Sequence, residues 1–183
     1  PDKEALFIAG TTDGHVDLPR ANRAGMVGGF FAMFPPPLKP APGAAPQQPN
    51  YASGQLPPAL ALADAQVSTH GMAAILLRLE RLGALDVCRS AAEIRAAIAG
   101  ERLAAIFHIE GAEAIDTKFH TLEVLYAAGL RSVGITWSRA NAFGTGVPFR
   151  HDADPDIGPG LTAAGKDLVQ LCDEMGVMID LSH

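Results

Sequence analysis

Short, nearly continuous apolar runs alternate along this chain with longer segments whose apolar positions recur at helical spacing. The run at 103–109 (LAAIFHI) is typical of a strand that is buried on both faces of a sheet. We expect strands at 6–9, 26–34, 103–109, 131–136 and 177–181, and helices at 59–82, 90–99, 121–128 and 162–175. This alternation predicts an α/β fold with a parallel sheet covered by helices, either a doubly wound open sheet or a (β/α) barrel.

Capping residues and prolines set the limits of several segments. Ser90, with Glu93 three residues later, has the pattern of a capping box, and Thr162 is a second expected N-cap. Residues 35–58 are so rich in proline that neither a helix nor a sheet ladder can run through them, which predicts an irregular excursion. A second long loop is expected at 137–160, where asparagine, glycine and proline gather.

Composition narrows the class of protein. The 183 residues are 48% hydrophobic, which is enough for one sizeable core. A net charge of −6 offers no basic surface for nucleic acid, and no apolar run approaches the ~18 residues of a membrane span. Cys88 and Cys172 lie in segments that predict small buried hydrophobes rather than a disulfide. We expect a cytoplasmic protein, with a periplasmic or secreted location left open because the chain starts without Met.

Metal-type side chains follow three of the expected strands. His15 and Asp17 come after the first strand and, two residues apart in an extended segment, point the same way. Glu110 follows the third strand and His183 the fifth. Imidazole nitrogens and carboxylate oxygens suit a divalent metal such as zinc. Barrel enzymes place their chemistry at the carboxyl ends of several strands, and neither the dinucleotide fingerprint nor the phosphate-binding loop is present, so the barrel is favoured.

Four motifs carry a resemblance to a known family. In chain order they are DGHVDLP (13–19), IEGAEAI (109–115), GLTAAG (160–165) and IDLSH (179–183). They closely resemble the membrane (renal) dipeptidase family of zinc peptidases, over nearly the whole chain apart from the Pro-rich excursion. The resemblance implies a (β/α)8 TIM-type barrel of the metal-dependent hydrolase superfamily, with two zinc ions or other divalent metals in their place.

The resemblance also implies a site. Carried over residue by residue, His15 and Asp17 bind the first zinc, Glu110 bridges both metals and His183 binds the second. The implied activity is hydrolysis of the peptide bond of small dipeptides by a metal-bridging hydroxide, with Glu110 and Asp17 as catalytic residues. Two alternatives stay open: the same chemistry on another small amide or lactone, and an incomplete fragment without catalysis.

Two further residues lie near the expected site. Trp137 occupies the place after the fourth strand where family members often have a substrate-binding histidine, so it is a candidate for substrate binding or for packing at the barrel mouth. His108 precedes Glu110 by two residues on the same strand face, and we expect it to be a core histidine with a satisfied hydrogen bond.

The eight-stranded barrel that the resemblance implies has more strands than this chain supplies. We count about five of the eight, and the second-zinc histidine and the substrate-carboxylate binder have no candidate here. Residues 1–183 are therefore expected to be the N-terminal portion of one barrel domain, with the remainder on a separate chain or in a missing segment. The other expected partner is a small dipeptide substrate, with no nucleic acid, no membrane span and a homo-oligomer left open.

Overall fold

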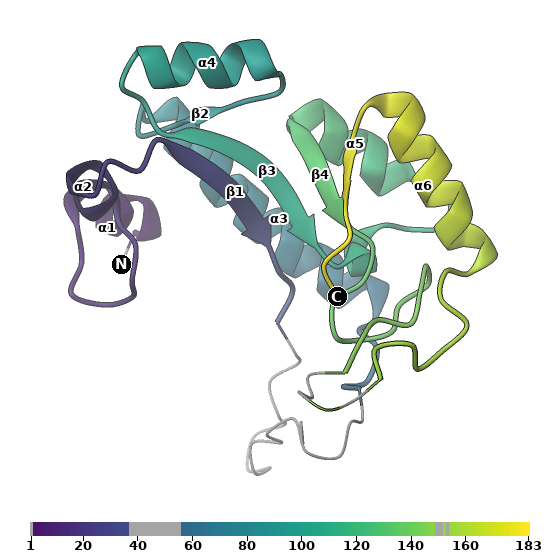
Figure 1. The fold of residues 1–183 in the computed structure, drawn as a ribbon. Coiled ribbons are helices and arrows are strands. Elements are labelled where there is room, and N and C mark those ends of the chain that lie inside the picture. Colours follow the sequence, from purple (N-terminus) through teal and green to yellow (C-terminus); the bar gives the residue numbers. More distant parts are fainter. Residues whose placement is uncertain (1, 37–55, 149–151, 153) are drawn as a thin grey trace.

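The computed structural model of the protein describes residues 2–36, 56–148, 152 and 154–183 (Figure 1). Parallel strands alternate with helices along the chain. The elements are α1 (Lys3–Ala9), α2 (Leu18–Arg23), β1 (Gly28–Met33), α3 (Leu62–Arg81), β2 (Asp86–Val87), α4 (Ala91–Ala99), β3 (Ala104–Glu110), the short 3-10 helix η2 (Ala112–Ala114), α5 (His120–Ala128), β4 (Leu130–Gly134), α6 (Ala163–Met175) and β5 (Met178–Asp180).

The sheet is built around β3. Strand β1 runs alongside nearly the whole of β3, whereas β2 and β4 follow one another along its opposite edge, and β5 pairs with β4. Every one of these pairings is parallel. The register aligns Glu110 of β3 with Gly134 of β4, and Gly134 with Asp180 of β5, so the carboxyl ends of three strands meet at one edge.

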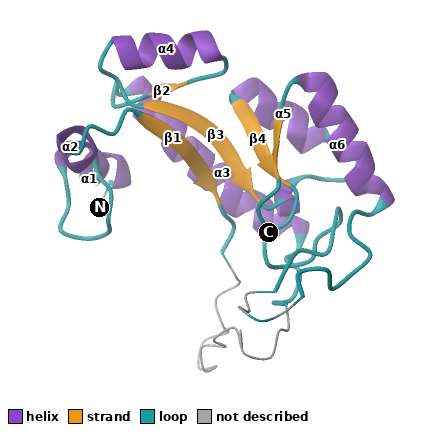
Figure 2. Cartoon of the chain, in the orientation of Figure 1, coloured by secondary structure: helices purple, strands orange, loops and turns teal. Residues whose placement is uncertain are grey.

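The two faces of the sheet differ in what covers them. Phe107 and Ile109 of β3 are buried in the main core, where side chains of α3, α5 and α6 pack against them (Figure 2). Because successive strand residues point to opposite faces, His108 and Glu110 lie on the other face. Phe30 of β1, which shares that face, is 53% exposed. Helix α4 packs on this face at the amino end of β3, where Ala97 meets Ala104, whereas Phe30 shows that the face is open to solvent farther along.

Most of the predicted elements are confirmed. The expected strands at 26–34, 103–109, 131–136 and 177–181 correspond to β1, β3, β4 and β5. The four expected helices correspond to α3, α4, α5 and α6, with ends that differ by at most three residues. Helix α2, strand β2 and η2 were not predicted. Most of the Pro-rich segment lies outside the described residues, and the described part of the loop at 137–160 contains no helix or named strand.

The predicted first strand, at 6–9, is wrong: these residues belong to helix α1. The Asp2 side chain caps this helix by accepting a hydrogen bond from the backbone N–H of Glu4. Glu4 in turn pairs with Arg78 of α3, and Phe7 and Ile8 pack against the main core. The apolar run is therefore one turn of a short helix that packs on α3 through Phe7 and Ile8, rather than an extended strand.

The predicted helix caps are confirmed. The Ser90 hydroxyl accepts a hydrogen bond from the backbone N–H of Glu93 at 3.2 Å, and the Thr162 hydroxyl accepts one from that of Gly165 at 3.0 Å. The Glu93 carboxylate completes the first cap one residue early, because it accepts from the N–H of Arg89 at 2.7 Å instead of from that of Ser90. These caps fix where α4 and α6 begin.

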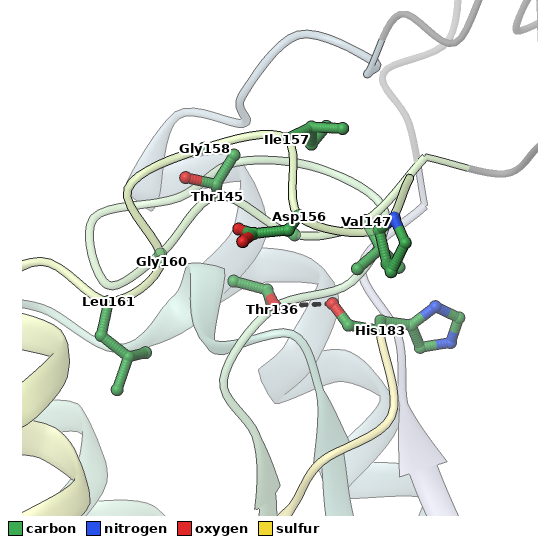
Figure 3. Close-up of a pocket in the computed structure, with 12 residues that line it drawn as sticks. Thr136, Thr145, Val147, Asp156, Ile157, Gly158, Gly160, Leu161 and His183 are labelled. Atoms are coloured by element: carbon green, nitrogen blue, oxygen red, sulfur yellow. Dashed lines mark hydrogen bonds between the residues drawn. The ribbon is translucent and has the colours of Figure 1, made fainter. Parts of the chain in front are cut away.

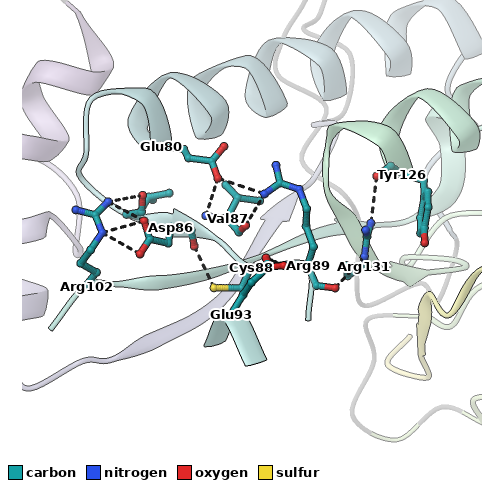
Figure 4. A network of polar contacts seen from close by, with 10 residues as sticks. Glu80, Asp86, Val87, Cys88, Arg89, Glu93, Arg102, Tyr126 and Arg131 are labelled. Carbon is teal, nitrogen blue, oxygen red and sulfur yellow. Dashed lines mark hydrogen bonds and ion pairs between the residues drawn. The ribbon is translucent and has the colours of Figure 1, made fainter. Parts of the chain in front are cut away.

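A polar network ties the start of β3 to its neighbours (Figure 4). The Arg102 guanidinium donates to the Asp86 carboxylate at 2.8 Å, and Arg89 pairs with Glu80 at 3.4 Å. Arg131 of β4 donates to the Arg89 carbonyl at 3.1 Å. This network connects α3, β2 and β4 near the amino ends of β2, β3 and β4.

The predicted state of the cysteines is confirmed, since Cys88 and Cys172 are both free and buried. Burial raises the pKa of the Cys172 thiol to about 11, so this thiol stays protonated at neutral pH. In the part of the chain that the structure describes, no helix is both long and apolar enough to cross a bilayer.

Candidate functional site

Two of the predicted site residues meet at the carboxyl edge of the sheet. Glu110 is the last residue of β3, and His183 lies three residues after β5. His183 Nε2 is 3.2 Å from Glu110 Oε1, and both side chains are partly exposed, at 23% and 31%. The contact brings the imidazole and the carboxylate together at the carboxyl edge of the sheet, where both are accessible to a ligand.

His183 is held in place from β4. The Thr136 hydroxyl donates to the His183 carbonyl at 3.0 Å (Figure 3), and Ser138 Oγ lies 3.4 Å from His183 Nδ1. The Trp137 ring lies beside the imidazole, with its centroid 6.2 Å from that of the His183 ring. The loop that follows β4 (the β4 loop, from residue 135 on) thus orients the imidazole through its Nδ1 atom, so that Nε2 points toward Glu110.

Beneath this pair, a histidine is buried in the same face. His108 Nδ1 lies 2.9 Å from Ser132 Oγ and its Nε2 lies 3.6 Å from Asp180 Oδ2. Its ring meets Phe30 edge-on at 6.0 Å. Burial lowers the pKa of His108, against the opposing charge of Asp180, so the imidazole is neutral at neutral pH. The prediction of a satisfied core histidine is confirmed.

His15 and Asp17 lie elsewhere. His15 is exposed, in a bend at 12–15 that connects α1 to α2, away from the arrowheads of β1 and β3 (Figure 1). Asp17 is buried as the N-cap of α2. The backbone N–H of Arg20 at 2.8 Å, together with that of Thr11 and the Arg20 guanidinium, holds the pKa of Asp17 below its usual value. In this arrangement both Asp17 oxygens are already engaged by donors.

The predicted metal donors therefore do not form one set in this arrangement. A carboxylate and an imidazole are the right chemistry for zinc, and Glu110 and His183 supply one of each. Within the described ranges, no group of three or more His, Cys, Asp or Glu side chains could hold a metal ion. His15 and Asp17 stay predicted ligands, and to join Glu110 the segment between α1 and α2 would have to move.

A buried ion pair next to the site was not predicted. Glu113 of η2 and Arg139 of the β4 loop are almost fully buried, and Arg139 Nε donates to Glu113 Oε1 at 3.0 Å. Burial raises the pKa of Glu113, and the Arg139 guanidinium opposes that rise. The only sequence signal was a second glutamate three residues after Glu110, and nothing marked Arg139 as its partner 26 residues later.

Trp137 lies between this ion pair and His183. Its ring contacts that of Phe34 at 4.7 Å between centroids, and the Arg139 guanidinium lies 5.5 Å from its centre. The indole therefore forms part of the wall beside His183. Its role in substrate binding stays a prediction.

A cavity of about 200 Å³ opens beside His183 (Figure 3). The loop between β4 and α6 forms most of its lining, with Thr145, Asp156 and Leu161 around it and Thr136 at its base. The isolated bridge between Gly144 and Leu161 closes this loop on itself. An open cavity therefore lies next to His183, one of the two converging donors.

Comparison with known proteins identifies relatives that match nearly the whole chain. Residues 4–183 match the profile of the family described as membrane dipeptidase, peptidase family M19. An uncharacterized protein encoded in the PQQ-III 3′ region of Acinetobacter calcoaceticus is 34% identical over 194 residues, which cover 100% of this chain and 58% of that protein.

Solved structures agree with the sequence comparison. The metallopeptidase dipeptidase AC is 41% identical, with a TM-score of 0.87, over 100% of this chain and 51% of its own. A metallopeptidase from Rhodobacter sphaeroides, solved with a phosphinate mimic of the dipeptide L-Ala-D-Ala, is 40% identical with the same TM-score, over 100% of this chain and 53% of its own. The chain thus spans about half the length of these solved relatives.

These comparisons confirm the predicted fold class, a parallel α/β sheet of the TIM-barrel type. They also confirm the resemblance that the four motifs carried, because the matched residues 4–183 contain all of them. The chain belongs to the membrane dipeptidase family, peptidase family M19.

Proposed function

We propose that the protein carrying this chain is a metal-dependent dipeptidase, and that Glu110 and His183 belong to its catalytic centre. The observation that carries this proposal is the 3.2 Å approach of His183 Nε2 to Glu110 Oε1 at the carboxyl edge of a parallel sheet. Barrel enzymes hold their reacting groups at that edge. Membership of a dipeptidase family supports the reaction class.

The proposed metal content is two zinc ions, or other divalent metals, with Glu110 as the bridging ligand and His183 as a ligand of one ion. Zinc bound there would polarise the peptide carbonyl and activate a water molecule for attack. Ser138, which lies against His183 Nδ1, would keep the imidazole oriented toward the metal. His15 and Asp17 would complete the first zinc site only after Asp17 leaves its contacts with Arg20 and Thr11.

The proposed substrate is a small dipeptide. The Rhodobacter sphaeroides relative was solved with a phosphinate mimic of L-Ala-D-Ala, and a cavity of about 200 Å³ opens beside His183 in this chain. Another small amide or lactone is the alternative substrate class. A non-catalytic fragment is the other alternative, and it is favoured by the separation of His15 and Asp17 from Glu110.

We also propose that residues 1–183 are the N-terminal portion of one barrel domain. The support is that the chain covers about half the length of its solved relatives, while Phe30, on the sheet face that carries Glu110, is 53% exposed. Further strands would cover that face, whichever chain supplies them. A cytoplasmic location and a homo-oligomer stay predictions.

Hydrolysis of L-Ala-D-Ala tests the function. The protein carrying this chain, loaded with zinc, is expected to release free alanine, which chromatography of the products measures. Removal of the metal by a chelator is expected to abolish the release, and added zinc to restore it. Protein that binds zinc yet cleaves no dipeptide would contradict the proposal. If it then opened a small lactone or another amide, the alternative substrate class would replace it.

A further inference from the structure

The ion pair of Glu113 and Arg139 is almost completely buried, and a contribution to stability does not explain this burial. Their side chains are 1% and 0% exposed. Among the described residues, Glu113 Oε2 and Arg139 Nη1 are buried without a hydrogen-bond partner. Desolvating two charges while leaving one acceptor and one donor unsatisfied costs stability relative to apolar side chains of similar volume. The pair therefore needs an explanation other than added stability.

The pair connects the loops that follow three strands. Glu113 belongs to η2, directly after β3, and Arg139 to the loop after β4. Arg139 Nη2 also donates to the carbonyl of Pro35, which follows β1, at 3.0 Å. One guanidinium thus joins the carboxyl ends of β1, β3 and β4, which surround Glu110.

The same guanidinium lies against two aromatic rings. Its central carbon is 5.5 Å from the centre of the Trp137 ring and 5.7 Å from that of Phe34, within the range of a cation–π contact. The Trp137 ring in turn approaches His183, with 6.2 Å between the ring centroids. An unbroken series of contacts therefore leads from Glu113 through Arg139 and Trp137 to His183.

We propose that Glu113 and Arg139 are positioning residues that fix the Trp137 indole beside His183. The planar guanidinium donates hydrogen bonds through its edge to Glu113 and Pro35, and it also lies near two aromatic rings. A lysine ammonium cannot reproduce this combination. Glu113 sets the rotation of the guanidinium, and the guanidinium sets the position of the indole. The catalytic consequence rests on the proposed dipeptidase function, whereas the position of the indole does not.

Trp137 provides its own readout, because it is the one tryptophan in the 183 residues. Fluorescence of this chain, excited at wavelengths where tyrosine does not absorb, therefore reports the surroundings of Trp137 alone. The informative variants are Arg139→Lys, which keeps the charge, and the double variant Glu113→Leu with Arg139→Met, which removes both charges. The matched control is Arg131→Lys, since Arg131 stacks on Tyr126 at 4.0 Å and does not touch Trp137.

If the pair positions the indole, Arg139→Lys and the double variant both shift the tryptophan emission to longer wavelength and make it easier to quench with acrylamide. Arg131→Lys is expected to change neither the emission nor the quenching. In the protein carrying this chain, we expect Arg139→Lys to lower kcat/KM for L-Ala-D-Ala about 10- to 100-fold with the zinc content unchanged. The double variant, folded by circular dichroism, would overturn the proposal if its emission and quenching matched those of the unsubstituted chain.

The two proposals fail in different ways. If the unsubstituted protein cleaves no dipeptide, the proposed function fails and the fluorescence of the variants still decides the positioning role. If the protein does cleave dipeptides, while Arg139→Lys changes neither the emission nor kcat/KM, the positioning role fails and the function stands. Should the double variant not fold, the Arg139→Lys measurements alone decide.

Discussion

Replacing Glu110 by glutamine is expected to lower dipeptide hydrolysis by about 10³-fold or more. The glutamine has nearly the same shape, but it lacks the negative charge that draws a metal to His183 Nε2, 3.2 Å away. A Lewis acid contributes several kcal/mol to the transition state, and each 1.36 kcal/mol is a factor of ten in rate. Steady-state rates with L-Ala-D-Ala, together with zinc content by elemental analysis, measure both consequences.

The control for this variant is Glu123→Gln. Glu123 lies on the exposed face of α5, and the substitution there makes the same change of charge without touching the sheet edge. It is expected to leave the rate and the zinc content unchanged. A Glu110→Gln protein that retained full zinc content and full rate would exclude Glu110 from the catalytic centre.

Replacing Arg139 alone by methionine is expected to lower the free energy of unfolding by about 3–5 kcal/mol. Glu113 would then be left buried without its counter-charge, and it could remain in the core only by taking up a proton. The double variant Glu113→Leu with Arg139→Met removes both charges and is expected to recover most of that loss. Urea unfolding monitored by circular dichroism measures all three proteins.

Arg102→Met is the matched control for the stability measurement. Arg102 also pairs with a carboxylate, Asp86 at 2.8 Å, but both side chains are 39% exposed. An exposed pair is worth about 0–1 kcal/mol, so the loss there should be small. Equal losses for Arg139→Met and Arg102→Met would show that burial of the Glu113 pair has no special energetic weight.

The sequence predicted the elements that have strong local signals. The continuous apolar run of β3 and the capping residues Ser90 and Thr162 identified their elements, because these signals lie within one segment. The run at 6–9 was assigned to the wrong structure, since four consecutive apolar residues do not distinguish a strand from one turn of a helix. The Asp2 cap, with Glu4 two residues later, was the local signal for a helix.

The sequence predicted only the part of the candidate site that is formed by residues at the ends of strands. Glu110 and His183 meet because parallel strands end at one edge, and this follows from the alternation of elements. The prediction for His15 and Asp17 relied on a strand that is in fact α1, and whether they bind metal is still to be measured. The contact of Glu113 with Arg139 depends on how two loops pack across the sheet edge, which no local pattern reveals.

Locating the metal shows whether Glu110 and His183 belong to a metal centre. Crystals of the protein carrying this chain, grown with zinc, can be measured on both sides of the zinc absorption edge to give an anomalous difference map. If Glu110 and His183 bind metal, a zinc peak is expected within about 2.0–2.2 Å of a carboxylate oxygen of Glu110, and one at that distance from an imidazole nitrogen of His183. Zinc peaks that lie only elsewhere, with none at Glu110 or His183, would contradict it.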